Sequence, residues 1–223
     1  MSFLRACCAT LGATLAFAAD AHAPPPSFPT PEFEPPAAGS YALPAIQPAP
    51  AGEVIDGSGR RRALADFTHG RITLLGLVYT RCSDAEGCPR ATWAFSAVRA
   101  LLREHGELES RVRLVTLSFD PVHDDFRTLA AYAARMGARR PGAEWHFLTT
   151  PSKRALKPIV EGFGQDLRVA SDSRARPGTE EFTHTLKVFL IDPAGAVREI
   201  YSTAFLMPEM IVNDMATLDL ERR

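Results

Sequence analysis

Two cysteines, Cys82 and Cys88, have the residue type and the position to carry chemistry in this chain. They lie in the segment Arg81–Pro89, between a continuous apolar run and a helical pattern, and the other cysteines are close to the N-terminus. Thiols at such a junction can pair as a disulfide, exchange electrons with a partner, or bind a soft metal ion such as Cu(I). The residues alone leave open a disulfide, a metal site and an alternation between the two.

The residues around the two cysteines act on thiol ionisation in opposite directions. The proline after Cys88 suits the first position of a helix, so Cys88 would lie at a helix N-terminus, where the helix dipole favours a thiolate. Arg81 beside Cys82 acts in the same direction. Asp84 and Glu86 oppose ionisation by like-charge repulsion, and they could instead supply a hard oxygen ligand. We therefore hypothesise that this loop lets a carboxylate approach a bound metal.

The N-terminus predicts export to the periplasm. Arg5 precedes the apolar segment Ala6–Ala18, and Ala21-His22-Ala23 supplies small residues around a cleavage site, so residues 1–23 are predicted to be a cleaved signal peptide. Export would place Cys82 and Cys88 in a compartment that oxidises thiols. A structural disulfide is therefore the ordinary alternative to a metal site.

Length and composition predict one globular domain with flanking segments. The chain has 223 residues, of which 46% are hydrophobic, and a net charge of −1. Such a charge balance lacks the concentrated basic face that binds nucleic acid, and no apolar run is long enough for a transmembrane span in the mature chain. Residues 24–51 are rich in proline and alanine, which predicts a disordered leader before a domain at residues 52–220.

The elements that position the cysteines follow from the hydrophobic pattern. Ile72 to Tyr79 is a continuous apolar run, typical of a strand buried on both faces. A helix begins at Pro89, with apolar residues at helical spacing and with Arg99, Arg103 and Glu104 toward the other side. The remaining predicted elements are a hairpin around Asp56-Gly57, strands at Val112–Phe119, Trp145–Leu148, Thr185–Ile191 and Ala196–Tyr201, and helices beginning near Asp124 or Asp125, Thr150 and Pro208. This order predicts an α/β thioredoxin-like sandwich, with a central mixed sheet, an N-terminal hairpin and flanking helices.

Four motifs of the domain occur together in one known family. They are Tyr79-Thr80-Arg81-Cys82 with Cys88-Pro89, Leu117-Ser118-Phe119-Asp120-Pro121 with Asp124, Trp145-His146-Phe147-Leu148-Thr149, and Phe182-Thr183-His184-Thr185 before Phe189-Leu190-Ile191-Asp192-Pro193-Ala194-Gly195. Together they resemble the Sco/SenC family of thioredoxin-like copper-binding proteins. The resemblance covers roughly Gly52 to Leu218.

The resemblance implies a copper site and a role in cytochrome c oxidase assembly. In that family two cysteines and a late histidine bind copper, and by position these ligands are Cys82, Cys88 and His184. Two thiolates and an imidazole also suit both Cu(I) and Cu(II). The resemblance thus implies an exported metallochaperone, a binding protein rather than an enzyme, that delivers copper to a respiratory oxidase copper-centre subunit or to another copper protein. We expect it to be a monomer.

The sequence departs from the family pattern in two places. The family usually has three residues between its cysteines, and this chain has five between Cys82 and Cys88. Thr183 stands where an acidic residue often precedes the histidine. The alternative function is a periplasmic thiol-disulfide oxidoreductase that uses Cys82 and Cys88 on the same fold. A peroxide-reducing relative would need a proline-threonine context before its reactive cysteine, and that context is missing.

Other residues of chemically capable type have ordinary structural interpretations. Asp120 and Asp124 are interpreted as turn and cap residues, and Met215 fits the apolar pattern of the last helix, which Met207 and Met210 are expected to follow. Four further histidines are interpreted as structural or surface residues: His69, His105, His123 and His146.

Overall fold

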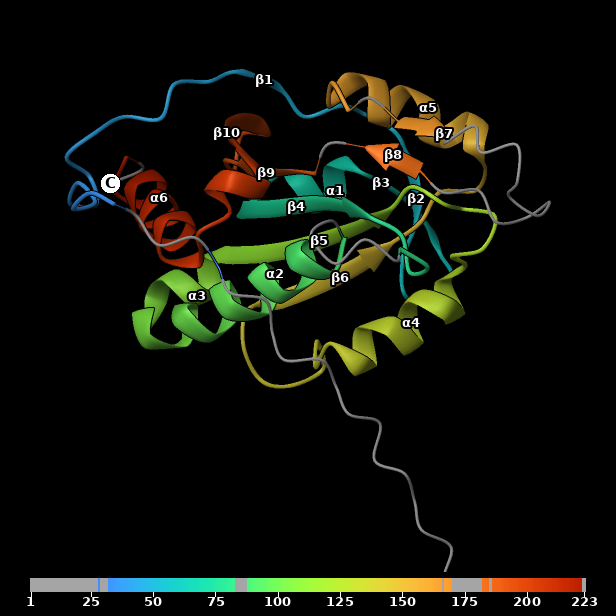
Figure 1. Cartoon of the computed structure of the whole chain (residues 1–223), viewed down its shortest axis with the longest axis horizontal. Coiled ribbons are helices and arrows are strands. Elements are labelled where there is room, and N and C mark those ends of the chain that lie inside the picture. Colours follow the sequence, from blue (N-terminus) through green and yellow to red (C-terminus); the bar gives the residue numbers. More distant parts are fainter. Residues whose placement is uncertain are drawn as a thin grey trace, which may run out of the picture.

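A six-stranded mixed sheet, in the order β1-β10-β9-β4-β5-β6, forms the centre of the protein (Figure 1). The computed structural model describes residues 28, 32–82, 88–165, 167–169, 182–184 and 186–221. The sheet strands are β1 (Gln47–Pro48), β4 (Ile72–Val78), β5 (Val112–Ser118), β6 (Glu144–Leu148), β9 (Lys187–Ile191) and β10 (Ala196–Ser202). Two antiparallel pairs lie outside this sheet: β2 (Glu53–Ile55) with β3 (Arg61–Ala63), and β7 (Leu167–Val169) with β8 (Phe182–His184).

Helices cover the sheet on both faces. They are α1 (Ala65–Thr68), α2 (Cys88–Leu102), α3 (Glu107–Arg111), α4 (Phe126–Arg135), α5 (Lys153–Gly162) and α6 (Pro208–Leu220), with 3-10 turns η1 (Arg103–His105) and η2 (Thr203–Phe205). Figure 1 shows α2 and α4 on one side of the sheet and α5 on the other. Among the described residues, no helix is long and apolar enough to cross a bilayer. This arrangement confirms the predicted thioredoxin-like fold with a central mixed sheet.

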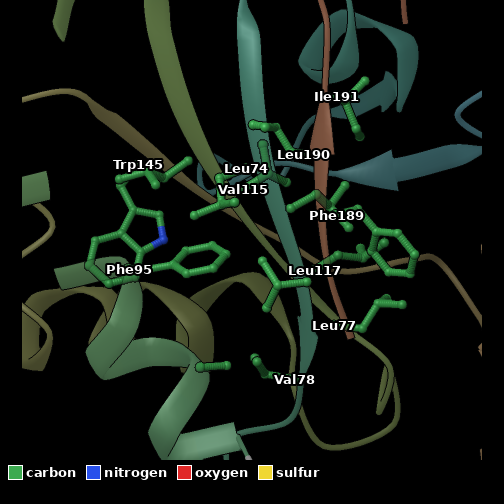
Figure 2. Packing of buried hydrophobic residues seen from close by; sticks show 14 of the residues in the cluster. Leu74, Leu77, Val78, Phe95, Val115, Leu117, Trp145, Phe189, Leu190 and Ile191 are labelled. Atoms are coloured by element: carbon green, nitrogen blue, oxygen red, sulfur yellow. The ribbon is translucent and has the colours of Figure 1, made fainter. Parts of the chain in front are cut away.

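The two central strands are buried along their whole length because both faces are covered. Every residue of β4 and of β5 is buried, and the two strands pair in parallel while β9 runs antiparallel to β4. On the α2 side, the rings of Phe95 and Trp145 lie 5.9 Å apart (Figure 2). On the α5 side, the rings of Phe163 and Phe189 lie 4.5 Å apart. The core thus holds the end of β4, after which the cysteine loop begins.

Part of the segment expected to be a disordered leader instead docks on the domain, from Pro36 onward, where the Pro36 carbonyl accepts a hydrogen bond from Asn213 of α6. Gln47 and Pro48 form the edge strand β1 against β10, and Leu43 is buried with 6% of its surface exposed. The Tyr41 hydroxyl donates to the Asp214 carboxylate of α6 at 2.5 Å. The proline-rich composition predicted disorder, but a proline is compatible with an edge strand. The docking also depends on a few side chains whose partners lie far away in the sequence.

Arg99 is also placed differently from the prediction. The helical pattern put it on the polar side of α2, yet only 8% of its surface is exposed. Backbone carbonyl groups of residues 137–143 accept its guanidinium hydrogen bonds. A charged side chain is buried here because its donors are satisfied, which a hydrophobic pattern cannot register.

Candidate metal and redox site

The cysteine loop begins where β4 ends. Tyr79, directly after the strand, is buried and packs against Phe119, with ring centroids 4.9 Å apart. The Cys82 amide donates to the Tyr79 carbonyl at 3.4 Å, so the chain turns immediately after the strand. Phe119 in turn donates its amide to the Val78 carbonyl. The first cysteine is therefore held at the carboxyl end of two buried parallel strands.

Cys82 and Cys88 lie in contact, and both are thiols in this structure. Cys82 is partly exposed, whereas Cys88 is fully buried as the first residue of α2. A hydrogen bond to Cys82 raises the pKa of the Cys88 thiol far above its ordinary value, and burial and the negative charge of an ionised Cys82 act in the same direction. Backbone hydrogen bonds at the helix start act in the opposite direction, as expected, but they are outweighed. The partly exposed Cys82 is the sulfur that a reagent reaches first.

Asp124 ties the start of the cysteine loop to the end of β5. Its buried carboxylate accepts hydrogen bonds from the Thr80 amide at 3.0 Å, from the Thr80 hydroxyl at 2.5 Å and from the Ser118 hydroxyl at 2.6 Å. The helix cap is its neighbour Asp125, which accepts from the Thr128 amide at 2.7 Å. Of the two predicted cap positions Asp125 is the right one, and Asp124 instead anchors the strand end before Cys82.

A second charged group lies beside Cys82. Arg81 donates to the buried Asp120 carboxylate at 3.0 Å, and its Nη2 lies 2.7 Å from Nδ1 of His123. The same His123 nitrogen lies 2.9 Å from Asp120 Oδ2. His123, interpreted from the sequence as structural or surface, is thus part of the hydrogen-bonded surroundings of the loop. The sequence signal for this contact was the position of His123 three residues after Asp120 in a turn, which brings the imidazole close to the carboxylate.

Tyr132 of α4 is connected to Cys88 through Thr92, a role that the sequence did not predict. Thr92 donates its hydroxyl hydrogen to the Cys88 carbonyl at 2.9 Å, and the Tyr132 hydroxyl lies 2.9 Å from the Thr92 oxygen. Because Thr92 has one hydroxyl hydrogen, Tyr132 is the donor between the two. Burial raises the pKa of Tyr132, and the nearby Cys88 and Cys82 act in the same direction when ionised. The sequence signal was a lone aromatic hydroxyl among the small residues of α4.

His184 lies in β8, where its backbone pairs with Leu167. The following strand, β9, pairs Val188 with Gly76 in an antiparallel register, so the residues before β9 lie toward the end of β4 from which Cys82 follows. The backbone therefore places His184 toward the same end of the sheet as the cysteines. Asp84 and Glu86 lie outside the described residues, so the carboxylate hypothesis stays a prediction.

The other predicted structural residues divide between core and surface. Met207 and Met215 are buried and Met210 is partly buried, in agreement with a core role. His69 and His105 are exposed, and His146 hydrogen-bonds Glu144 at 3.2 Å. Within the described residues, no three His, Cys, Asp or Glu side chains converge as a ready metal-binding group.

The chain matches the sequence model of the SCO1/SenC family over residues 50–218. That match spans most of its length, and the protein belongs to this family. A search of curated proteins finds no match.

Several solved structures of similar fold are Sco proteins. Copper-bound ScoI from Arabidopsis thaliana has 16% identity and a TM-score of 0.63, covering 77% of this chain and 97% of its own. A SCO1/SenC family lipoprotein from Bacillus anthracis has 21% identity and a TM-score of 0.64, covering 82% and 99%. BsSco, a member of the Sco family of cytochrome c oxidase assembly proteins in which a disulfide switch was identified, has 20% identity and a TM-score of 0.57, covering 77% and 93%. At such identities these similarities establish the fold.

Proposed function

We propose that this protein binds copper through Cys82, Cys88 and His184 and acts as a copper chaperone or assembly factor for a respiratory oxidase. The observation that carries the proposal is the contact between the two cysteine side chains at the strand-to-helix junction. Membership of the SCO1/SenC family supports it, as do neighbours of the same fold that were solved with copper bound.

The donor atoms suit copper. Two adjacent sulfurs favour a soft ion such as Cu(I), and an added imidazole accepts either oxidation state. A bound ion would replace the proton of Cys88, so the raised pKa of that thiol makes copper compete with protons for the site. Copper here is cargo. The buried Cys88, whose carbonyl group accepts a hydrogen bond from Thr92, supplies a sulfur donor in a fixed position. The partly exposed Cys82 supplies a sulfur donor that a partner protein can reach.

A titration of the reduced chain with Cu(I) and Cu(II) tests the proposed ligands. We expect Cys82→Ser and Cys88→Ser to weaken binding of both ions and His184→Ala to weaken Cu(II) binding and change its absorption spectrum. His105→Ala is the matched control, because His105 is exposed in η1. Unchanged Cu(II) affinity and spectrum in His184→Ala would remove the histidine from the site.

The cellular context is part of the same proposal. Residues 1–23 act as a signal peptide, the mature protein is a periplasmic monomer, and its recipient is the copper-centre subunit of an oxidase. Mass spectrometry of the protein recovered from the periplasm should find Pro24 as the first residue. Recovery of the intact chain with Met1 in the cytoplasm would contradict export.

A thiol-disulfide oxidoreductase is the second candidate, and the unequal exposure of the two sulfurs favours it. Cys82 can attack a partner disulfide, and the buried Cys88 can then displace the partner thiol, so that two thiols are converted into one disulfide as the partner's disulfide is reduced. Insulin reduction by the copper-free chain tests this activity. Reduction that is lost in Cys82→Ser, together with unmeasurable copper affinity, would favour the oxidoreductase over the chaperone.

A further inference from the structure

A cavity of about 160 Å³ lies between the second half of α2 and the connection from α4 to β6. It is much larger than the roughly 10–15 Å³ that one water molecule requires. Three of its lining side chains are the arginines Arg99, Arg103 and Arg140, and Met136 and Trp145 contribute an apolar wall. The residues that line it include no aspartate or glutamate. The cavity is therefore cationic.

Arg99 is fixed at this cavity by the backbone around it. Its Nε donates to the Ala143 carbonyl at 2.8 Å, its Nη1 to the Gly137 carbonyl at 3.0 Å, and its Nη2 to the Arg140 carbonyl. Gly142 has a φ of +145°, and a side chain there would begin 3.1 Å from the Arg99 Nε. The connection can wrap the guanidinium this closely only with glycine at that position. The positive charge is thus built in, and neutral carbonyl groups satisfy its donors.

Arg103 and Arg140 add two further charges beside this fixed one. Both are exposed, and in the described part of the chain neither forms an ion pair with a carboxylate. Burial lowers the pKa of Arg99; the nearby carboxylate of Glu109, which does not line the cavity, raises it, and the charge of Arg103 lowers it by less. Glu109 offsets the charge of Arg99, whereas Arg103 and Arg140 at the mouth of the cavity keep positive charges that an anion could neutralise.

We propose that this cavity binds a small oxyanion of the phosphate or sulfate type. Arg103 and Arg140 have donors available for its oxygens, because arginine binds such groups in a bidentate manner, and Arg99 supplies a fixed charge behind them. The structural alternative is that the arginines only complement the carboxyl end of α2. That alternative accounts for the charge but requires no saturable anion binding.

The site lies away from the cysteines along α2, so the proposal is independent of copper binding. Arg99 is in the last turn of the helix, whereas Cys88 is its first residue. The oxyanion could be free in solution or be the phosphate of a lipid headgroup. The chemistry at the protein is the same in both cases, and the two sources can be separated experimentally.

Isothermal titration of the copper-free full chain with sodium phosphate and with sodium sulfate tests the proposal, at constant ionic strength set with chloride. We expect saturable binding that the double variant Arg103→Gln, Arg140→Gln weakens at least about tenfold, because it loses the charge-assisted donors. Arg154→Gln is the control: it removes an exposed positive charge on α5 and should change the affinity less than about twofold. The melting temperature of each variant in chloride alone verifies folding.

Vesicles of phosphatidylglycerol and of phosphatidylcholine identify the source of the oxyanion. Binding to both kinds of vesicle, or to the anionic kind alone, that disappears in the double variant would assign a lipid phosphate. Phosphate binding without vesicle binding would assign a soluble anion. The proposal is overturned if neither the free anions nor the vesicles show saturable binding, or if Arg154→Gln weakens binding as much as the double variant does.

Discussion

At the residue scale, Cys88 shows how a local preference is outweighed by its surroundings. A helix start favours a thiolate, but the side chain is fully buried and hydrogen-bonded to Cys82, and both effects favour the protonated form. The two sulfurs therefore differ in accessibility although they belong to one pair. This asymmetry is what lets one sulfur react or exchange while the other stays fixed.

The raised pKa of Cys88 predicts how stability depends on pH. The pKa of Cys88 in the folded chain lies above the unfolded value of about 8.5. The protonated thiol therefore makes its full contribution to the free energy of unfolding below about pH 8.5, and this contribution is lost as the pH rises further. The loss approaches about 1.4 kcal/mol per pH unit for one proton. Urea unfolding of the reduced, copper-free chain between pH 7 and pH 10 measures it. Cys88→Ala should flatten the profile, and an equally steep profile in that variant would contradict the assignment.

Asp124 carries a second residue-scale prediction. In Asp124→Asn the buried hydrogen bonds to Thr80 and Ser118 lose the carboxylate charge, and the amide nitrogen must donate to the Thr80 hydroxyl in place of accepting from it, so the free energy of unfolding falls by about 1–3 kcal/mol. Asp125→Asn is the matched control, because asparagine caps a helix as well as aspartate does and Asp125 forms the cap. Equal losses in the two variants would show that Asp124 is an ordinary turn residue.

At the scale of elements, the hydrophobic pattern predicted the strands and helices whose own residues carry a clear local signal. The apolar run at Ile72–Tyr79 became β4, and the proline at position 89 marked the start of α2. The edge strand β1 was missed because two residues carry no periodicity, and its pairing with β10 is formed with residues far along the chain. An element held by tertiary contacts alone leaves little local signal.

The docked segment predicts that the domain is not complete at Gly52. A chain beginning at Gly52 would lose the burial of Leu43 and the Tyr41–Asp214 hydrogen bond, and it would expose the edge of β10. We expect a loss of about 2–4 kcal/mol in unfolding free energy relative to a chain beginning at Pro24. Tyr41→Phe should show part of this loss. Identical urea midpoints for the two chain lengths would contradict the prediction.

At the scale of the whole molecule, the residues that sequence reasoning missed are those whose partners are distant. Asp124 bonds Thr80 across 44 positions, and Tyr132 reaches Thr92 across 40. The cysteines could be identified because their chemistry and motif are local, whereas their support comes from α4 and from the end of β5. A single sequence states the residue types but not which of them the fold brings together.

Copper binding should couple the site to the stability of the whole fold. A ligand that binds only the folded chain raises its unfolding free energy, by about 2.7 kcal/mol at a free concentration a hundred times the Kd. The proposed sulfur donors are brought together by the end of β4 and the start of α2, which unfolding separates. We therefore expect Cu(I) to raise the melting temperature of the reduced chain and to have little effect on Cys88→Ser. A similar rise in both proteins would mean that copper binds elsewhere, and no rise in either would mean that the unfolded thiols bind it as tightly as the folded site does.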